Sequence, residues 1–319
     1  MNPTTVLNRT TLSAACLLLA AALFTSCRCP SPNGASNVEK QEFSFALTAD
    51  MREFTDPKHP GPHYFEGACA ALRDLGPGDF MISPGDIDPP SAIRATLDYF
   101  LGSNYVWYPV VGNHEAETPE DMAWLRAWGR QPIPGLVRRG PTGCETTTYS
   151  FDHGPAHFVV LNQYYNGKSD IGSRGDMIDP LYQWLRMDLD ANRKQIVFVV
   201  GHEPIIPTGD MDNGRLRHEG DSLDAHPANT RRFLDLMRQH RVTAYLTAHS
   251  HNTSVTNLAG VWQIDAGHAR GLGDKGVRSS FLKLHVQPSG CRVDIYRDDG
   301  KGGAYKLTKS VKLDAAGHL

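Results

Sequence analysis

The chain lacks an excess of basic residues, a C-x-x-C pair and any internal repeat or low-complexity segment. Its 32 Lys and Arg against 35 Asp and Glu give a formal net charge of −3. This charge offers no basic surface of the kind that binds nucleic acid. Without C-x-x-C spacing among its six cysteines, a thiolate metal site is not expected. The absence of repeats argues against a surface adhesin or scaffold. The longest apolar stretch, Leu12 to Phe24, is too short for a transmembrane helix.

That stretch is typical of a secretory signal, because Arg9 precedes it and the small residues Thr25 and Ser26 follow it. We therefore predict a signal peptide over residues 1–26, a polar tether over 27–40 and one domain over 41–319. Small residues before a cysteine resemble a bacterial lipobox, with Cys27 as the lipidated residue. The expected location is then the bacterial envelope, facing the periplasm, with membrane contact only through this anchor. Ordinary cleavage and a soluble secreted enzyme are the alternative.

If Cys27 is lipidated and Cys16 is removed with the signal, four cysteines remain. Export to an oxidising compartment permits them to form disulfides. Four cysteines allow three full pairings, and the sequence does not choose among them. The four are Cys29, Cys69, Cys144 and Cys291.

With 40% hydrophobic and 21% charged residues, the chain is expected to bury a core. Helical patterns run over Tyr64–Leu75, Pro180–Asn192 and Pro227–His240. Short apolar runs that read as strands alternate with them, and a strand-rich tail covers Ser280–Lys312. The fold class predicted is α/β, a layered β-sandwich flanked by helices.

Five polar clusters follow apolar runs that read as buried strands. Polar residues at the carboxyl ends of strands in an α/β sheet converge on one crevice. Each cluster alone has an ordinary structural explanation, such as an Asx-turn or a helix cap for Asp86. Together they supply carboxylate, amide and imidazole, which are ligands for divalent metals. The residues concerned are Asp50, Asp86, Asn113, His114, His202, His249 and His251.

The order Asp50, Gly85-Asp86, Gly112-Asn113-His114-Glu115, Gly201-His202 and Ala248-His249-Ser250-His251 resembles the calcineurin-like metallophosphoesterases. The resemblance spans about Asp50 to His251. It implies two mixed sheets flanked by helices. It also implies two divalent cations (Zn, Mn or Fe) that activate a water to hydrolyse a small phosphate ester.

By position, the resemblance implies a role for each residue. Asp86 bridges the two metals, and His114 assists the leaving group or steadies the phosphoryl oxygens. Ligands of the second metal are Asn113, His202 and His249, and ligands of the first are Asp50 and His251.

Two positions depart from the family pattern: Arg52 in the first motif, and Pro89 where the second motif often has an acid, an amide or a tyrosine, with Asp88 one residue early. Arg52 stands where the first motif has a histidine, and a guanidinium cannot ligate a metal. Arg52 either holds the substrate phosphate as a catalytic residue or forms a salt bridge with Glu53, Asp88 or Glu115. Asp88 either replaces the missing ligand or caps the next turn. The alternative function is a phosphate-binding domain with an impaired first metal site and little turnover.

Other polar residues follow these motifs. The loop Gly209 to Pro227, with His218, faces the substrate or is a plain surface excursion. His268 and Arg270 follow a late apolar run, and either could approach phosphate.

Overall fold

The computed structural model describes residues 42–52, 63–270, 274–300 and 304–314. Contacts divide the chain into two units, 1–38 and 39–319, and every described residue belongs to the second. The predicted signal peptide, the tether, Cys27 and Cys29 lie outside the described residues. Within the described part, no helix combines the length and apolar character needed to span a bilayer.

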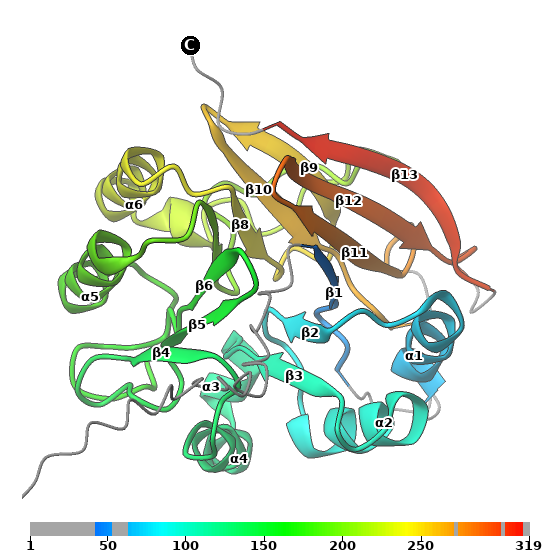
Figure 1. Ribbon diagram of the computed structural model, residues 1–319, viewed down its shortest axis with the longest axis horizontal. Helices are drawn as coiled ribbons and strands as arrows, with labels where there is room; N and C mark the ends of the chain where they lie inside the picture. The colour runs from blue at the N-terminus through cyan, green and yellow to red at the C-terminus, as the bar shows by residue number, and fades with distance from the viewer. Residues whose placement is uncertain (1–41, 53–62, 271–273, 301–303, 315–319) are drawn as a thin grey trace, which may run out of the picture. The chain divides into compact units, whose positions relative to one another are not determined.

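Two mixed sheets form the centre of the fold (Figure 1). In the first, β1, β2 and β3 are parallel neighbours, and β11 to β13 continue antiparallel from β1. Its order is β13 (Lys306–Leu313), β12 (Gly290–Arg297), β11 (Ser280–Gln287), β1 (Phe43–Leu47), β2 (Phe80–Ser83) and β3 (Val106–Pro109).

The second sheet has a parallel centre, β6-β7-β8-β10, with antiparallel strands at both edges. Its order is β4 (Leu136–Arg139), β5 (Tyr149–His153), β6 (Ala156–Val160), β7 (Ile196–Val200), β8 (Ala244–Thr247), β10 (Val261–Ala266) and β9 (Thr253–Leu258).

Helices connect most of the neighbouring parallel strands and lie beside the two sheets (Figure 1). The parallel pair β8 and β10 is instead connected through β9. A connection between parallel strands needs a crossover, which a helix usually supplies. These helices are α1 (His63–Leu75), α2 (Pro90–Leu101), α3 (Asn113–Glu117), α4 (Pro119–Gly129), α5 (Asp179–Ala191), the 3₁₀ helix η1 (Leu223–Ala225) and α6 (Pro227–Gln239).

Three apolar clusters hold these layers together. The first combines residues of both sheets, including Phe45 and Phe198, whose rings meet edge to face 5.6 Å apart. A second packs α5 and α6 on the second sheet through residues such as Leu185 and Phe233. The third packs α1, α2 and α4 beside the first sheet, with Leu97 among its members. The fold class predicted from the sequence, two mixed sheets flanked by helices, is confirmed.

The disulfides that export would permit are not formed among the described cysteines. Cys69, Cys144 and Cys291 are all buried and unbonded. Any full pairing of these three with Cys29 would join two of them. Each instead fills a place in one of the apolar clusters, as free cysteines commonly do.

Candidate metal centre

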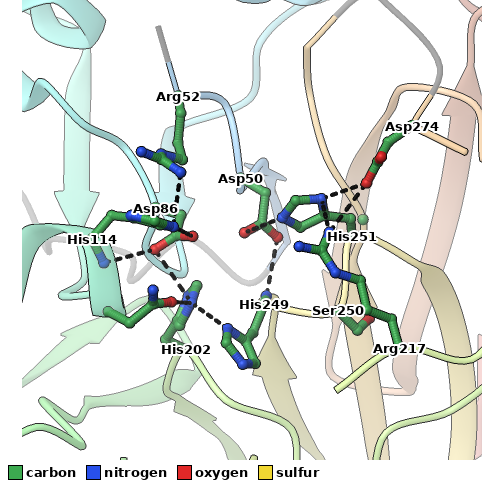
Figure 2. Close-up of polar contacts among 12 residues, drawn as sticks. Asp50, Arg52, Asp86, His114, His202, Arg217, His249, Ser250, His251 and Asp274 are labelled. Carbon is green, nitrogen blue, oxygen red and sulfur yellow. Dashed lines mark hydrogen bonds and ion pairs between the residues drawn. The ribbon is translucent and has the colours of Figure 1, made fainter. Parts of the chain in front are cut away.

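The predicted site residues lie just beyond the carboxyl ends of five strands. Asp50 follows β1, Asp86 follows β2 and Asn113 opens α3 after β3, all from the first sheet. His202 follows β7, and the segment His249–His251 follows β8, both from the second sheet. Figure 2 shows side chains from both groups turned toward one another.

Tight turns aim several of these side chains. The backbone φ is 48° at Asp50, 53° at Asp86, 70° at His249 and 58° at His251. Non-glycine residues rarely adopt this left-handed region, and such conformations gather at functional sites.

Two glycines leave the space in which the turn at Asp86 is built. A Cβ on Gly112 would lie 2.4 Å from both the backbone nitrogen and Oδ1 of Asp86. A Cβ on Gly85, where φ is +92°, would lie 2.5 Å from Nδ1 of His202. The close approach of these three segments therefore requires glycine at both positions.

Glu115 holds the same turn in place through hydrogen bonds to its backbone. Its buried carboxylate accepts hydrogen bonds from the backbone N–H groups of Asp86, Ile87 and Gly112, at 3.0, 2.7 and 2.7 Å. Burial raises the pKa of Glu115, and the negative charge of Asp86 raises it further. Glu115 thus joins the β2 turn to the start of α3 without facing the cavity.

One group of donors surrounds His202. Its Nδ1 bonds the carbonyl of Pro84 at 2.7 Å, which places the ring proton there and leaves Nε2 as an acceptor. That Nε2 lies 3.2 Å from Oδ1 of Asn113, 3.4 Å from Oδ1 of Asp86 and 3.1 Å from Nδ1 of His249. His249 in turn bonds the carbonyl of Asp221 through Nε2. Two imidazole lone pairs and two oxygens therefore face one point, as the ligands of a cation do.

A second group consists of Asp50, Asp86 and His251, which offer ligand atoms within 4.8 Å of one another. His251 bonds Oδ2 of Asp274 through Nδ1 at 2.7 Å, and its Nε2 faces Oδ1 of Asp50 at 3.6 Å. This Oδ1 is buried and accepts no hydrogen bond from the described residues. An unsatisfied buried carboxylate oxygen beside an oriented imidazole fits a metal ion.

The electrostatics of the two groups agree with this geometry. Burial raises the pKa of Asp50, and it raises the pKa of Asp86 to about 6. Burial also lowers the pKa of His202 to about 3 and lowers the pKa values of His249 and His251. Neutral imidazoles beside crowded carboxylates suit divalent cations, whose charge would stabilise the ionised acids.

The donor set has a counterpart among known families. A sequence profile described as calcineurin-like phosphoesterase matches residues 43–253, more than half of the chain. The chain belongs to the calcineurin-like phosphoesterase family. The family predicts metal-dependent hydrolysis of phosphate esters.

Solved structures agree on the fold. GAP50, the anchor in the inner membrane complex of Plasmodium, has a TM-score of 0.56 at 15% identity, covering 86% of this chain and 90% of its own. A structure of PhoD has a TM-score of 0.58 at 12% identity, covering 87% of this chain and 71% of its own. At these identities the likeness concerns the fold alone. No curated protein matches the chain in sequence.

Arg52, which departs from the family pattern, pairs with the nearby acid Asp88. Nε of Arg52 bonds both carboxylate oxygens of Asp88, at 2.8 and 3.0 Å. The Asp88 carboxylate therefore meets a guanidinium, and of the salt bridges considered for Arg52 the one to Asp88 is present. The NH1 group of Arg52 also donates to Nε2 of His114 at 2.8 Å, so Arg52 still borders the site.

The phosphoesterase motifs open into a cavity of about 210 Å³. Sequence reasoning had considered His218 and Arg270, and both line it. His268 does not, because its buried ring bonds the carbonyl of Val277. Arg217, Asp274 and Lys275 were missed, because they lie in loops with no motif of their own. The lining residues are Arg52, Asp86, Asn113, His114, Arg217, His218, His249, His251, Arg270, Asp274 and Lys275.

Proposed function

We propose that this chain hydrolyses a small phosphate ester with two divalent cations held by the two groups that share Asp86. The observation that carries the proposal is the meeting of His202 Nε2 and His249 Nδ1 at 3.1 Å beside the oxygens of Asp86 and Asn113. Two lone pairs repel at this distance, so a cation between them accounts for the arrangement. Carboxylate, amide and imidazole ligands fit Zn, Mn or Fe.

The residues around the cations divide the remaining work. Bound divalent cations lower the pKa of water and polarise phosphoryl oxygens. Arg52 presents a guanidinium, fixed by Asp88, to a phosphate in the cavity. That phosphate takes the NH1 hydrogen bond that Nε2 of His114 now accepts. His114, whose side chain is 29% exposed at the cavity edge, then takes a proton from solvent at Nε2 and donates it to the leaving oxygen.

A second candidate function is phosphate binding with little turnover. Arg52 favours it, because the first motif thereby loses an imidazole ligand and leaves Asp50, Asp86 and His251 at that site. In this alternative the group around His202 fills with metal, and the guanidinium of Arg52 supplies the positive charge that the Asp50, Asp86 and His251 group lacks.

We also propose that the protein is exported, from the signal-like residues 1–26 and the lipobox-like sequence before Cys27. Labelling with a fatty acid in a bacterial host, for the wild type and for Cys27→Ser, tests the anchor. Label on both proteins, or on neither, contradicts lipidation at Cys27.

Metal content and hydrolysis together test the main proposal. We expect about two metal ions per chain after loading with Mn²⁺ or Zn²⁺, and release of phosphate from an aryl phosphate. Asp86→Ala, Asn113→Ala and His249→Ala should each abolish turnover and lower the metal content. His285→Ala, on β11 and outside the cavity, is the matched control for a lost histidine.

One ion per chain with phosphate binding but no turnover supports the second candidate instead. Full activity of His249→Ala, or a metal content unchanged by it, would refute the assigned site.

A further inference from the structure

The side chains that line the cavity present charged and hydrogen-bonding groups to a substrate, rather than apolar surface. Among the described residues that line it, every side chain is polar. Its volume of about 210 Å³ corresponds to about seven waters at roughly 30 Å³ each. Pockets for drug-sized ligands are larger and mostly apolar. An acyl chain therefore finds no apolar surface among these residues, whereas a small anionic group finds charge and hydrogen-bond donors.

Positive charge gathers at one end of this cavity. Arg217 and Lys275 line it there beside Asp274, and Arg215 approaches the same carboxylate from behind at 3.5 Å. Arg217 pairs with Asp274 at 3.1 Å, so two guanidinium groups share one acid. The lining includes two carboxylates, Asp86 and Asp274, among the described residues. The Asp274 end therefore has more cations than anions before any metal is counted.

Figure 2 shows this end apart from the guanidinium of Arg52. Arg52 and His114 lie on one side of the carboxylates Asp50 and Asp86, and Arg217 and Asp274 lie on the other. The phosphate that reacts is matched by the cations around Asp86 and by Arg52. The charge at the Asp274 end is left for another anion. The Arg217 side chain is 33% exposed and Lys275 is exposed, so both reach the rim of the cavity.

We propose that Arg217 and Lys275 form a second anion subsite, which selects phosphate esters that carry a further carboxylate or phosphate group. This inference rests on the proposed hydrolysis at the Asp86 centre and names its substrate class. The cations of the subsite bind the second group without taking part in the phosphoryl transfer. Because guanidinium forks match planar and tetrahedral oxyanions alike, carboxylate and phosphate are both accommodated.

The test compares esters that share a three-carbon chain. Glycerol 3-phosphate and 3-phosphoglycerate differ in a hydroxymethyl group against a carboxylate, and propyl phosphate and propane-1,3-diol bisphosphate differ in a second phosphate. We expect kcat/KM of the metal-loaded wild type to favour the anionic member of at least one pair about tenfold. The pair that shows the preference identifies the second group. Lys275→Gln should reduce the preference, and Lys275→Gln with Arg217→Gln should remove it.

Two further variants separate charge from shape. Lys275→Arg keeps the charge and should retain the preference. Lys309→Gln removes an exposed lysine on β13, outside the cavity, and should leave the preference as in the wild type. A preference that the double variant retains, or equal kcat/KM within each pair in the wild type, overturns the inference while leaving phosphoester hydrolysis in place.

Calorimetric binding decides the case in which no ester is hydrolysed with any metal. That outcome overturns the proposed reaction. Titration of the metal-loaded protein with 3-phosphoglycerate and glycerol 3-phosphate then supports the subsite if the first binds about tenfold more tightly and the double variant loses the difference. Equal affinities overturn it.

Discussion

A buried histidine outside the metal centre makes the stability of the fold depend on pH. His157 lies on β6 with its ring 2% exposed, between Asp152 at 2.7 Å and Asp188 at 2.9 Å. Burial alone would lower its pKa, but the hydrogen bonds to these two carboxylates outweigh burial and raise the pKa to about 9. Because the pKa is raised in the folded state, the charged ring stabilises the fold at low pH.

The size of this contribution follows from the two pKa values. An unfolded histidine titrates near 6.5, and one pKa unit corresponds to about 1.4 kcal/mol. The charged ring therefore contributes about 3 kcal/mol to the free energy of unfolding. The contribution is complete below about pH 6.5 and is lost as pH rises through about 9.

His157→Gln removes the charge and keeps one amide donor for Asp188. We expect urea denaturation to show the variant about 3 kcal/mol less stable than the wild type at pH 6, with the difference shrinking toward pH 9.5. A chelator in every sample keeps metal occupancy from varying with pH. A difference that stays constant from pH 6 to 9.5 would show that the ring is neutral in the folded state.

Two more variants probe how the metal centre is built. Gly112→Ala places a methyl group 2.4 Å from the backbone nitrogen of Asp86 and should lower Mn²⁺ affinity at least tenfold in a chelator-competition titration. Gly67→Ala in α1, whose Cβ would meet its nearest atom at 3.7 Å, should leave that affinity unchanged, and equal losses in both variants would count against the argument. Asp274→Asn removes the charged acceptor that orients His251 and should weaken metal binding about 10- to 100-fold by the same titration, whereas exposed Asp98→Asn should not. Wild-type affinity in Asp274→Asn would show that His251 is held by other contacts.

The strand ends and the residues that follow them could be predicted because both signals are local. An apolar run such as Ile196–Val200 marks a buried strand, and β7 has these bounds. The ordered motifs then placed Asp86, Asn113 and His202 at one edge, and the structure brings them together. Their roles as ligands remain predictions that metal analysis tests.

The features that the sequence did not predict depend on contacts between segments that are distant in the chain. Asp274 reaches His251 from the connection after β10, and no spacing in the sequence links that loop to the β8 end. For Arg52 the sequence offered three acidic partners, Glu53, Asp88 and Glu115, and the fold places Asp88 against its guanidinium. The sequence left open whether the cysteines pair, because composition and compartment say nothing about which thiols lie within bonding distance, and the described cysteines are free.

Asp50 comes from one sheet and His249 from the other, and the backbone N–H of His249 donates to Oδ2 of Asp50 at 3.0 Å. The two hydrogen-bonded ladders are otherwise joined largely by side-chain packing, which tolerates small sliding motions. A metal-loaded centre would therefore link the two sheets at the carboxyl ends of their strands. Substitutions that shift one sheet relative to the other, even far from the cavity, would then change the affinity for the metal ions.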